Sequence, residues 1–348
     1  MPELPDVTLY VEAIRARLVG RRLAGVRVAK PFVVRTFDPP VGALRGEVLT
    51  SVERLGKRIV LALGGELFAA IHLMIAGRLR YLEPAAGATR RTSSARRASS
   101  PLGARGPGPG DGWPPLPGKL ALLGLDFDAA DAGNAGRATL VLTEAGSERR
   151  AALHVVRGRA ALAALDAGGV EPLAVDRAGF AAALLRENHT LKRALTDPRL
   201  FAGIGNAYSD EILHRARLSP LAWTTRLGAD EIERLHDATR HVLRTFTDRM
   251  RAELAARSAP GALPAWPDTV TAFRPDMAVH GRYREPCPDC GTRVQRIVRG
   301  KHEVDYCPRC QTGGKLLADR ALSRLLRGDW PKTLEELDEH MRVRAAPA

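Results

Sequence analysis

The sequence begins Met1-Pro2-Glu3-Leu4-Pro5-Asp6-Val7, and this stretch sets where the fold starts. Proline suits the first turn of a helix, where its missing N–H removes no hydrogen bond. Apolar residues then recur at helical spacing, at Val7, Val11, Ile14 and Leu18. Gly20 is a typical helix stop, so the sequence predicts a helix over residues 6–19.

Pro2 and Glu3 also have a chemical interpretation. Removal of Met1 would turn the Pro2 nitrogen into a secondary amine. Because an α-amino group has a pKa of about 7.7–8.0, part of that amine is unprotonated near neutral pH. Such an amine can attack a sugar carbon and form an imine, with the adjacent Glu3 carboxyl as the acid. The alternative is that the prolines only stiffen the entry to the helix.

The composition is that of a basic globular protein. Its 348 residues are long enough for two domains. Lys and Arg (53) exceed Asp and Glu (39) by 14, which favours a polyanionic partner, nucleic acid before an anionic membrane surface. No apolar run approaches the roughly 18 residues of a membrane span. The first residues do not show the basic-then-apolar pattern of a signal peptide, so we expect none.

The first half of the chain reads as β structure. Short β-like runs separated by turn residues fall at 22–29, 48–54, 57–63, 66–73, 77–82, 120–128, 138–143 and 151–156. Regular short strands are typical of a sandwich or a barrel, and we assign residues 1–170 to a β-sandwich domain. Residues 84–118 are rich in Pro, Gly and Ser, with five arginines and one acid. We interpret them as a disordered basic insertion.

From residue 176 the periodicity becomes helical. Helices are expected at 177–187, 206–217 and 230–255, within a domain over residues 171–265; residues 257–268 suggest a linker. Between the first two helices lies Phe201-Ala-Gly-Ile-Gly-Asn206, a glycine turn followed by a residue that can cap the next helix. Backbone N–H groups at such a start bind anions. This motif is either a clamp for a DNA backbone or a helical hairpin with a structural Asn cap.

The last motif consists of two C-x2-C knuckles, Cys287/Cys290 and Cys307/Cys310, with 16 residues between them. Four thiolates suit one tetrahedral structural zinc ion; a redox dithiol pair is the alternative. The residues between the knuckles predict a β-hairpin with a basic tip, Arg296, Arg299, Lys301 and His302. This tip either contacts phosphate or is a solvated turn. We place this module at 266–312 and a tail with helices over 316–326 and 333–342 at 313–348.

Other polar residues are ambiguous on their own. Lys57 follows Gly56 at the head of a strand and can donate to a phosphate, although edge lysines are common. His72 and Met74 fit either a core or a binding surface. Lys192 lies just upstream of the glycine turn.

Together and in this order, the motifs resemble the formamidopyrimidine-DNA glycosylase and endonuclease VIII family of DNA repair enzymes. The resemblance covers most of residues 1–312. Its most specific motifs lie at the two ends of this range, in the N-terminal Pro-Glu-Leu-Pro stretch and in the four cysteines. It implies an α+β fold, in which an N-terminal helix and a β-sandwich domain precede a helix–two-turn–helix domain and a four-cysteine zinc hairpin.

The resemblance also implies roles for individual residues. Pro2 would be the nucleophile at the sugar C1′, and Glu3 the acid that assists ring opening. Met74 would fill the space left by an everted base, since C1′ is closed to attack while the base is stacked. The remaining contacts to DNA would come from Lys57, which also belongs to the catalytic group, and from His72, Lys192, Asn206, Lys301 and His302.

The chain departs from the family at three places. Asp6 stands where the family usually has Glu. His302 stands where an Arg is usual. An Asp-Pro-Arg-Arg-Phe-Gly segment of the family supplies an Arg and a Phe that fill the void, whereas the comparable stretch here is Leu142-Thr-Glu-Ala-Gly-Ser-Glu-Arg-Arg150, in which neither has an evident counterpart.

We therefore expect a bifunctional DNA glycosylase and abasic-site lyase with one structural Zn²⁺. Its partner would be double-stranded damaged DNA, with no membrane involved. We expect a cytoplasmic, nucleoid-associated monomer of a bacterial-type cell. The alternatives are a damaged-DNA-binding relative that is non-catalytic or only a lyase, and a zinc-ribbon adaptor without lesion chemistry.

Overall fold

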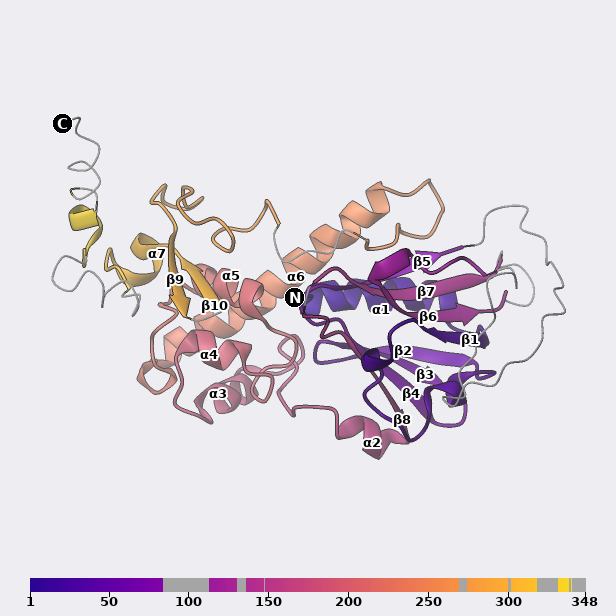
Figure 1. Ribbon diagram of the computed structural model, residues 1–348. Helices are drawn as coiled ribbons and strands as arrows, with labels where there is room; N and C mark the ends of the chain where they lie inside the picture. Colours follow the sequence, from indigo (N-terminus) through magenta and orange to yellow (C-terminus); the bar gives the residue numbers. More distant parts are fainter. Residues whose placement is uncertain are drawn as a thin grey trace, which may run out of the picture. The chain divides into compact units, whose positions relative to one another are not determined.

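The computed structural model describes residues 1–83, 113–129, 136–146, 148–268, 274–299, 302–317, 331–337 and 339. The chain divides into two compact units. Unit 1 comprises Met1–Asp166 and Thr247–Thr271, and unit 2 comprises Ala167–Phe246 and Ala272–Ala348. Each unit has its own set of secondary-structure elements (Figure 1).

Unit 1 contains helix α1 (Leu4–Leu18) and two four-stranded antiparallel sheets (Figure 1). The first sheet has the order β1-β6-β7-β5, with strands Leu23–Val28, Ala121–Phe127, Ala138–Glu144 and Gly77–Leu82. The second has the order β2-β3-β4-β8, with strands Leu49–Leu55, Arg58–Leu63, Leu67–His72 and Ala152–Arg157. The predicted helix and β-sandwich are confirmed.

Alternating side chains build the core of unit 1. In β4, Leu67, Ala69 and Ile71 join α1 and both sheets in one buried cluster. The intervening Phe68 and Ala70 point to the other face of the sheet, where they form a smaller cluster with Leu162 of helix α2 (Arg159–Ala163). The second sheet is therefore covered on both faces.

The end of helix α6 (Ala229–Ala256) belongs to unit 1. Its Met250 and Leu254 pack on Leu9 of α1. The following stretch, 257–268, which the sequence suggests is a linker, also packs on unit 1. There the indole N–H of Trp266 donates to the Leu79 carbonyl at 2.8 Å, and its ring stacks on Tyr81 with centroids 5.4 Å apart.

Unit 2 holds the predicted helices as α3 (Arg177–Leu185), α5 (Asn206–Ala216) and the first part of α6. It also holds α4 (Leu191–Thr196), the hairpin strands β9 (Gln295–Arg299) and β10 (His302–Tyr306), and α7 (Pro308–Thr312). The short helices α2 and α4 were not predicted, because five or six residues are too few to show a helical period.

Two predicted segments fall largely outside the described residues. Of the insertion 84–118, only residues 113–118 are described, and there the Pro114 carbonyl accepts a hydrogen bond from Arg27 at 2.9 Å. Of the helix expected at 316–326, only the first two residues are described, and they are not helical. Within 333–342, residues 334–337 are helical.

Candidate functional site

The start of α1 places three candidate groups together. Pro2 and Glu3 are both buried, with Glu3 in the cap position of the helix. The Asp6 carboxylate accepts the backbone N–H of Glu3 at 2.7 Å. In the part of the chain that the structure describes, the second oxygen of Asp6 has no hydrogen-bond partner. Two buried carboxyl groups therefore lie within the first turn after Pro2.

Burial and neighbouring cations shift the proton affinities here. Burial raises the pKa of Asp6 to about 7, and the Glu3 charge acts in the same direction. Burial also lowers the pKa of the terminal amine, which belongs to Met1 in this chain. Arg78 and Lys57 lower that pKa further, while Glu3 and Asp6 oppose them. Two cations and two carboxyl groups thus act on the chain terminus.

The loop between β4 and β5 presents Met74. Its backbone has φ +53°, which a residue with a side chain adopts only at a cost. The Met74 N–H donates to Nδ1 of His72 at 3.0 Å, and this bond holds the conformation. Burial lowers the pKa of His72 to about 4, with Arg58 and Lys57 contributing, so the ring is neutral at pH 7 and free to accept through Nδ1.

The turn between β7 and β8 corresponds to the stretch that departs from the family. The buried carboxylate of Glu144 accepts the backbone N–H groups of Arg150 and Ala151, at 2.9 and 3.0 Å. Ala151 itself is fully buried. The stretch from Leu142 to Ala151 contains no aromatic residue, so it has no ring with which to fill a void.

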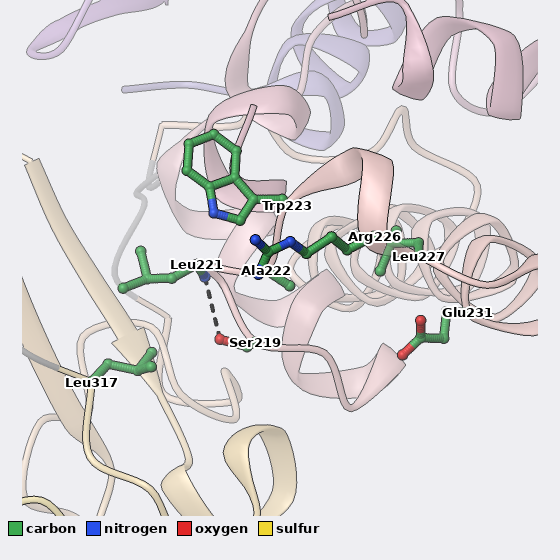
Figure 2. Close-up of a pocket in the computed structure, with 8 residues that line it drawn as sticks. All are labelled: Ser219, Leu221, Ala222, Trp223, Arg226, Leu227, Glu231 and Leu317. Atoms are coloured by element: carbon green, nitrogen blue, oxygen red, sulfur yellow. Dashed lines mark hydrogen bonds between the residues drawn. The ribbon is translucent and has the colours of Figure 1, made fainter. Parts of the chain in front are cut away.

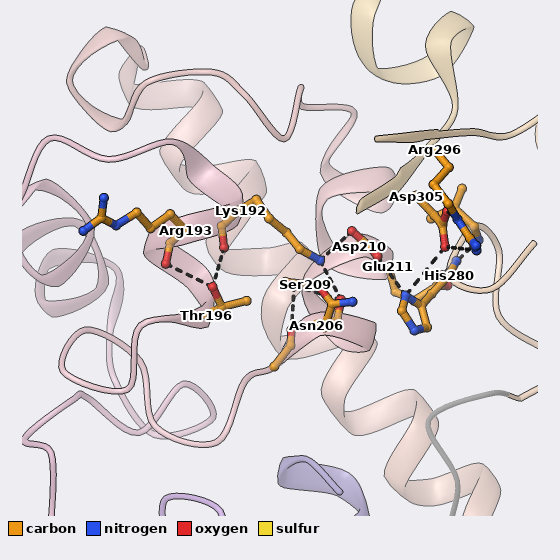
Figure 3. A network of polar contacts seen from close by, with 12 residues as sticks. Lys192, Arg193, Thr196, Asn206, Ser209, Asp210, Glu211, His280, Arg296 and Asp305 are labelled. Carbon is orange, nitrogen blue, oxygen red and sulfur yellow. Dashed lines mark hydrogen bonds and ion pairs between the residues drawn. The ribbon is translucent and has the colours of Figure 1, made fainter. Parts of the chain in front are cut away.

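In unit 2 the glycine turn leads into α5 as predicted, but Asn206 does not cap the helix. Gly205 occupies the cap position and Asn206 is the first helical residue. The Asn206 carbonyl accepts a hydrogen bond from Nζ of Lys192 at 2.6 Å. Nζ also pairs with Asp210 at 2.6 Å, and Lys192 is only 8% exposed. Figure 3 shows the Lys192 ammonium directed between Asn206 and Asp210.

Several buried polar residues here were not found from the sequence. Asp210, Glu211 and His214 lie on α5, and all three are buried. Their position beside the apolar residues of α5, Ile212 and Leu213, was a usable signal, because a charged side chain that is buried needs a partner. His280, the partner of Asp210, carries no such signal, because it lies 70 residues further along the chain.

The four predicted zinc ligands lie together. The thiol sulfurs of Cys290 and Cys307 are 3.4 Å apart, those of Cys287 and Cys310 are 4.0 Å apart, and all four fall within 4.8 Å of one another. Bonds of about 2.3 Å to a tetrahedral zinc require sulfurs about 3.8 Å apart. Nε2 of His214 lies 3.2 Å from the Cys287 sulfur. The donor set therefore fits one zinc ion with no open position.

The hairpin between the knuckles has the predicted form. Its strands pair in antiparallel register, with His302 opposite Arg299. Arg296 does not project from the tip, because its guanidinium binds Asp305 at 2.8 Å within the hairpin. Lys301 lies outside the described residues. The contact of His302 and Lys301 with DNA stays a prediction.

A separate pocket of about 400 Å³ lies in unit 2 (Figure 2). The residues that line it are Ser219, Leu221, Ala222, Trp223, Arg226, Leu227, Glu231 and Leu317. None of them is a candidate site residue. Among the helices that the structure describes, none has the length and apolar character needed to span a membrane.

Three family models match the chain along its length. The formamidopyrimidine-DNA glycosylase N-terminal domain matches residues 1–103, and the H2TH domain of the same enzymes matches residues 169–252. The zinc finger found in FPG and IleRS matches residues 284–313. The four-cysteine cluster is thus that of a zinc finger that holds one structural Zn²⁺.

Relatives match over most of the chain. The formamidopyrimidine-DNA glycosylase of Chloroflexus aurantiacus is 31% identical, over 89% of this chain and 98% of its own. That of Thermus thermophilus is 32% identical, over 90% of this chain and 100% of its own. An uncharacterized formamidopyrimidine-DNA glycosylase-like protein of Mycobacterium tuberculosis is 38% identical, over 46% of this chain and 94% of its own.

The fold is also that of solved structures. The Lactococcus lactis Fpg protein, solved with abasic-site DNA, matches with a TM-score of 0.66 at 22% identity. The match covers 89% of this chain and 99% of that one. Motifs, domain matches and full-length relatives agree, and the chain belongs to the formamidopyrimidine-DNA glycosylase family.

Proposed function

We propose that this protein is a bifunctional DNA glycosylase and abasic-site lyase that acts on oxidised bases in duplex DNA. The observation that supports this proposal is the arrangement at the start of α1. Pro2 and Glu3 are buried there, and burial, with Arg78 and Lys57 acting in the same direction, lowers the pKa of the nearby terminal amine. A binding protein needs neither a deprotonated amine nor a buried acid.

The proposed chemistry uses the Pro2 nitrogen after Met1 is removed. Its lone pair attacks C1′, the bond from C1′ to the base breaks, and the base leaves with a proton. The amine releases its own proton, and Glu3 protonates the ring oxygen as the sugar opens to an iminium ion. Loss of the C2′ proton then expels the 3′ phosphate by elimination, which breaks the strand.

The proposed DNA contacts lie in both units. In unit 1, Lys57 and His72 would face phosphates, and Met74 would enter the space of the everted base. In unit 2, the start of α5 at Asn206 and the hairpin tip, His302 and Lys301, would contact the backbone. The Lactococcus lactis relative was solved with abasic-site DNA, and the same class of ligand is proposed here.

Borohydride trapping on abasic DNA tests the nucleophile. Reduction of the iminium should leave a covalent protein–DNA product, and Pro2→Gly should weaken trapping strongly. The matched control is Pro5→Ala, since Pro5 lies in the same turn but has no terminal nitrogen. Full retention of Met1 by mass spectrometry, with cleavage intact, would exclude Pro2 as the nucleophile.

The β7–β8 turn favours a second candidate, a lyase that cleaves abasic sites but releases few bases. No aromatic residue is present between Leu142 and Ala151 to fill the void. Glu3→Gln separates the two functions, because it should slow base release more than cleavage of a preformed abasic site. A chain that cleaves abasic DNA but releases no oxidised base would support the second candidate.

A further inference from the structure

Lys192 stands out in unit 2 because its charge is already satisfied inside the protein. The side chain is 8% exposed, and Nζ donates to both the Asn206 carbonyl and Asp210 at 2.6 Å. Asp210 is 1% exposed. If Nζ turned to a DNA phosphate, the Asp210 carboxylate would lose its cation while remaining buried, which is costly.

Asp210 extends the contact toward the zinc hairpin. Its second oxygen accepts from Nδ1 of His280 at 2.8 Å, and that nitrogen lies 3.9 Å from the buried carboxylate of Asp305. Arg296 binds Asp305 through two nitrogens, at 2.8 and 3.2 Å. Figure 3 shows these residues as one continuous network from α4 to the hairpin.

A second carboxylate of α5 fixes the same segment. Glu211 accepts the backbone N–H groups of Ala278, Val279 and His280 at 2.7 to 2.9 Å. The segment that leads into the first zinc knuckle is therefore bound to α5 by main-chain and side-chain hydrogen bonds. The start of α5 and the root of the hairpin form one hydrogen-bonded body.

We propose that Lys192 and Asp210 are positioning residues, which set the start of α5 relative to the zinc hairpin, and that Lys192 does not itself contact phosphate. This inference rests on the proposed function, because it concerns how the two DNA-contacting elements of unit 2 are held in register. It replaces the direct phosphate contact that the sequence suggests for Lys192.

The salt dependence of DNA binding distinguishes the two roles. Each phosphate contact made by a cation contributes about 0.9 to the slope of log K against log salt. We expect Lys192→Met to weaken binding to a tetrahydrofuran abasic analogue roughly 10- to 100-fold, as expected for a buried partner left unsatisfied, with the slope unchanged. A slope that is shallower by about 0.9 in the variant would show that Lys192 contacts a phosphate directly, and it would overturn the proposal. Arg193→Met, which removes an exposed cation one residue away, is the matched control for charge loss.

A double variant tests the pairing itself. In Lys192→Met with Asp210→Asn, neither side chain is charged, so no buried charge is left without its partner, and the Asn oxygen can still accept from His280. We therefore expect the double variant to bind DNA better than Asp210→Asn alone. Hydrogen exchange at residues 278–281 should follow the same order, with protection lost in Asp210→Asn and restored in the double variant.

The outcomes separate this inference from the function on which it rests. If the losses of DNA affinity in Lys192→Met and Asp210→Asn simply add in the double variant, the positioning role is overturned and the proposed function is unaffected. If the wild-type chain does not bind the abasic analogue, both the proposed function and this inference are wrong. Trapping with borohydride, which reports on Pro2, is measured in parallel on every variant.

Discussion

At the scale of single residues, the most consequential departure from the family is Asp6. Its carboxyl is buried against the start of α1 and accepts the Glu3 N–H. A Glu at this position would need more room for one more methylene. The shorter side chain caps the turn, but its second oxygen has no hydrogen-bond partner among the described residues, and its pKa rises to about 7.

This raised pKa predicts a pH dependence of stability. Because the native pKa, about 7, exceeds the ordinary value of 3.8, the native state binds the proton more tightly than the unfolded chain. Stability is then lost as pH rises from about 4 to about 7. Asp6→Asn keeps the acceptor but cannot ionise. We expect the unfolding free energy of Asp6→Asn relative to the wild type, measured with urea, to rise by about 2–3 kcal/mol between pH 5 and pH 8. A relative unfolding free energy that stays constant over this range would contradict the prediction.

His72 gives a second prediction at this scale. Its neutral ring accepts the Met74 N–H, so we expect it to affect DNA binding through the conformation of the loop as well as through its own surface. His72→Ala should weaken binding to abasic DNA about tenfold, the worth of about one hydrogen bond. His72→Asn, whose amide oxygen can replace Nδ1, should recover most of the loss. Equal losses in both variants would exclude the bond to Met74 as the cause.

At the scale of elements, the β4–β5 turn depends on Gly77. A Cβ there would lie 2.1 Å from the carbonyl oxygen of Leu73, and that backbone atom cannot move without moving the turn. Gly77→Ala should therefore lower the thermal midpoint and abolish tight binding of abasic DNA. At Gly64 the close clash of a Cβ would be with the flexible end of Glu47, while the nearest backbone atom lies at an ordinary contact distance of 3.9 Å. Gly64→Ala is the control, and an equal effect of the two would refute this assignment.

The zinc module gives another prediction at this scale. Because metal binding supplies the folding free energy of a small module, Cys307→Ser should lose zinc and unfold the β9–β10 hairpin. Unit 1 should remain folded, since none of the described zinc-binding residues belongs to it. Elemental analysis and limited proteolysis measure both effects. Wild-type protein purified without chelator and found free of zinc would refute the site.

The elements also show what sequence can and cannot predict. The zinc knuckles and the first strands were predictable because their patterns are local. The network around Asp210 was not, because its partner His280 is 70 residues away. The sequence favours Asn206 as the cap of α5, whereas in the structure Gly205 occupies the cap position and Asn206 is the first helical residue. The sequence does not separate these two positions, because Gly and Asn are both common helix caps. The sequence around Lys192 does not show that this residue is buried, because its partners Asn206 and Asp210 lie 14 and 18 residues away.

At the scale of the whole molecule, the excess of 14 positive charges and the β7–β8 turn predict how lesions are chosen. Phosphate contacts should make binding strongly salt-dependent. The Arg and Phe with which the family fills the void and contacts the orphaned base have no assigned counterpart in this turn, and one bidentate contact to a base is worth about 1–3 kcal/mol of discrimination. Single-turnover cleavage of abasic sites should therefore be comparable opposite all four bases. A steep preference for cytosine would reveal a reader elsewhere in the chain.

Unit 1 is made from two separate stretches, and this has a consequence for its synthesis. On the ribosome, the side of α1 that Met250, Leu254 and Trp266 cover emerges first and stays open to water. Residues 167–246, 80 in number, must be translated before its cover arrives, which takes roughly 4–16 s at about 5–20 residues per second. During that interval the nascent chain exposes Leu9 and part of the Tyr10 ring. A message that ends before residue 247 would yield a fragment that keeps this apolar patch for its whole lifetime.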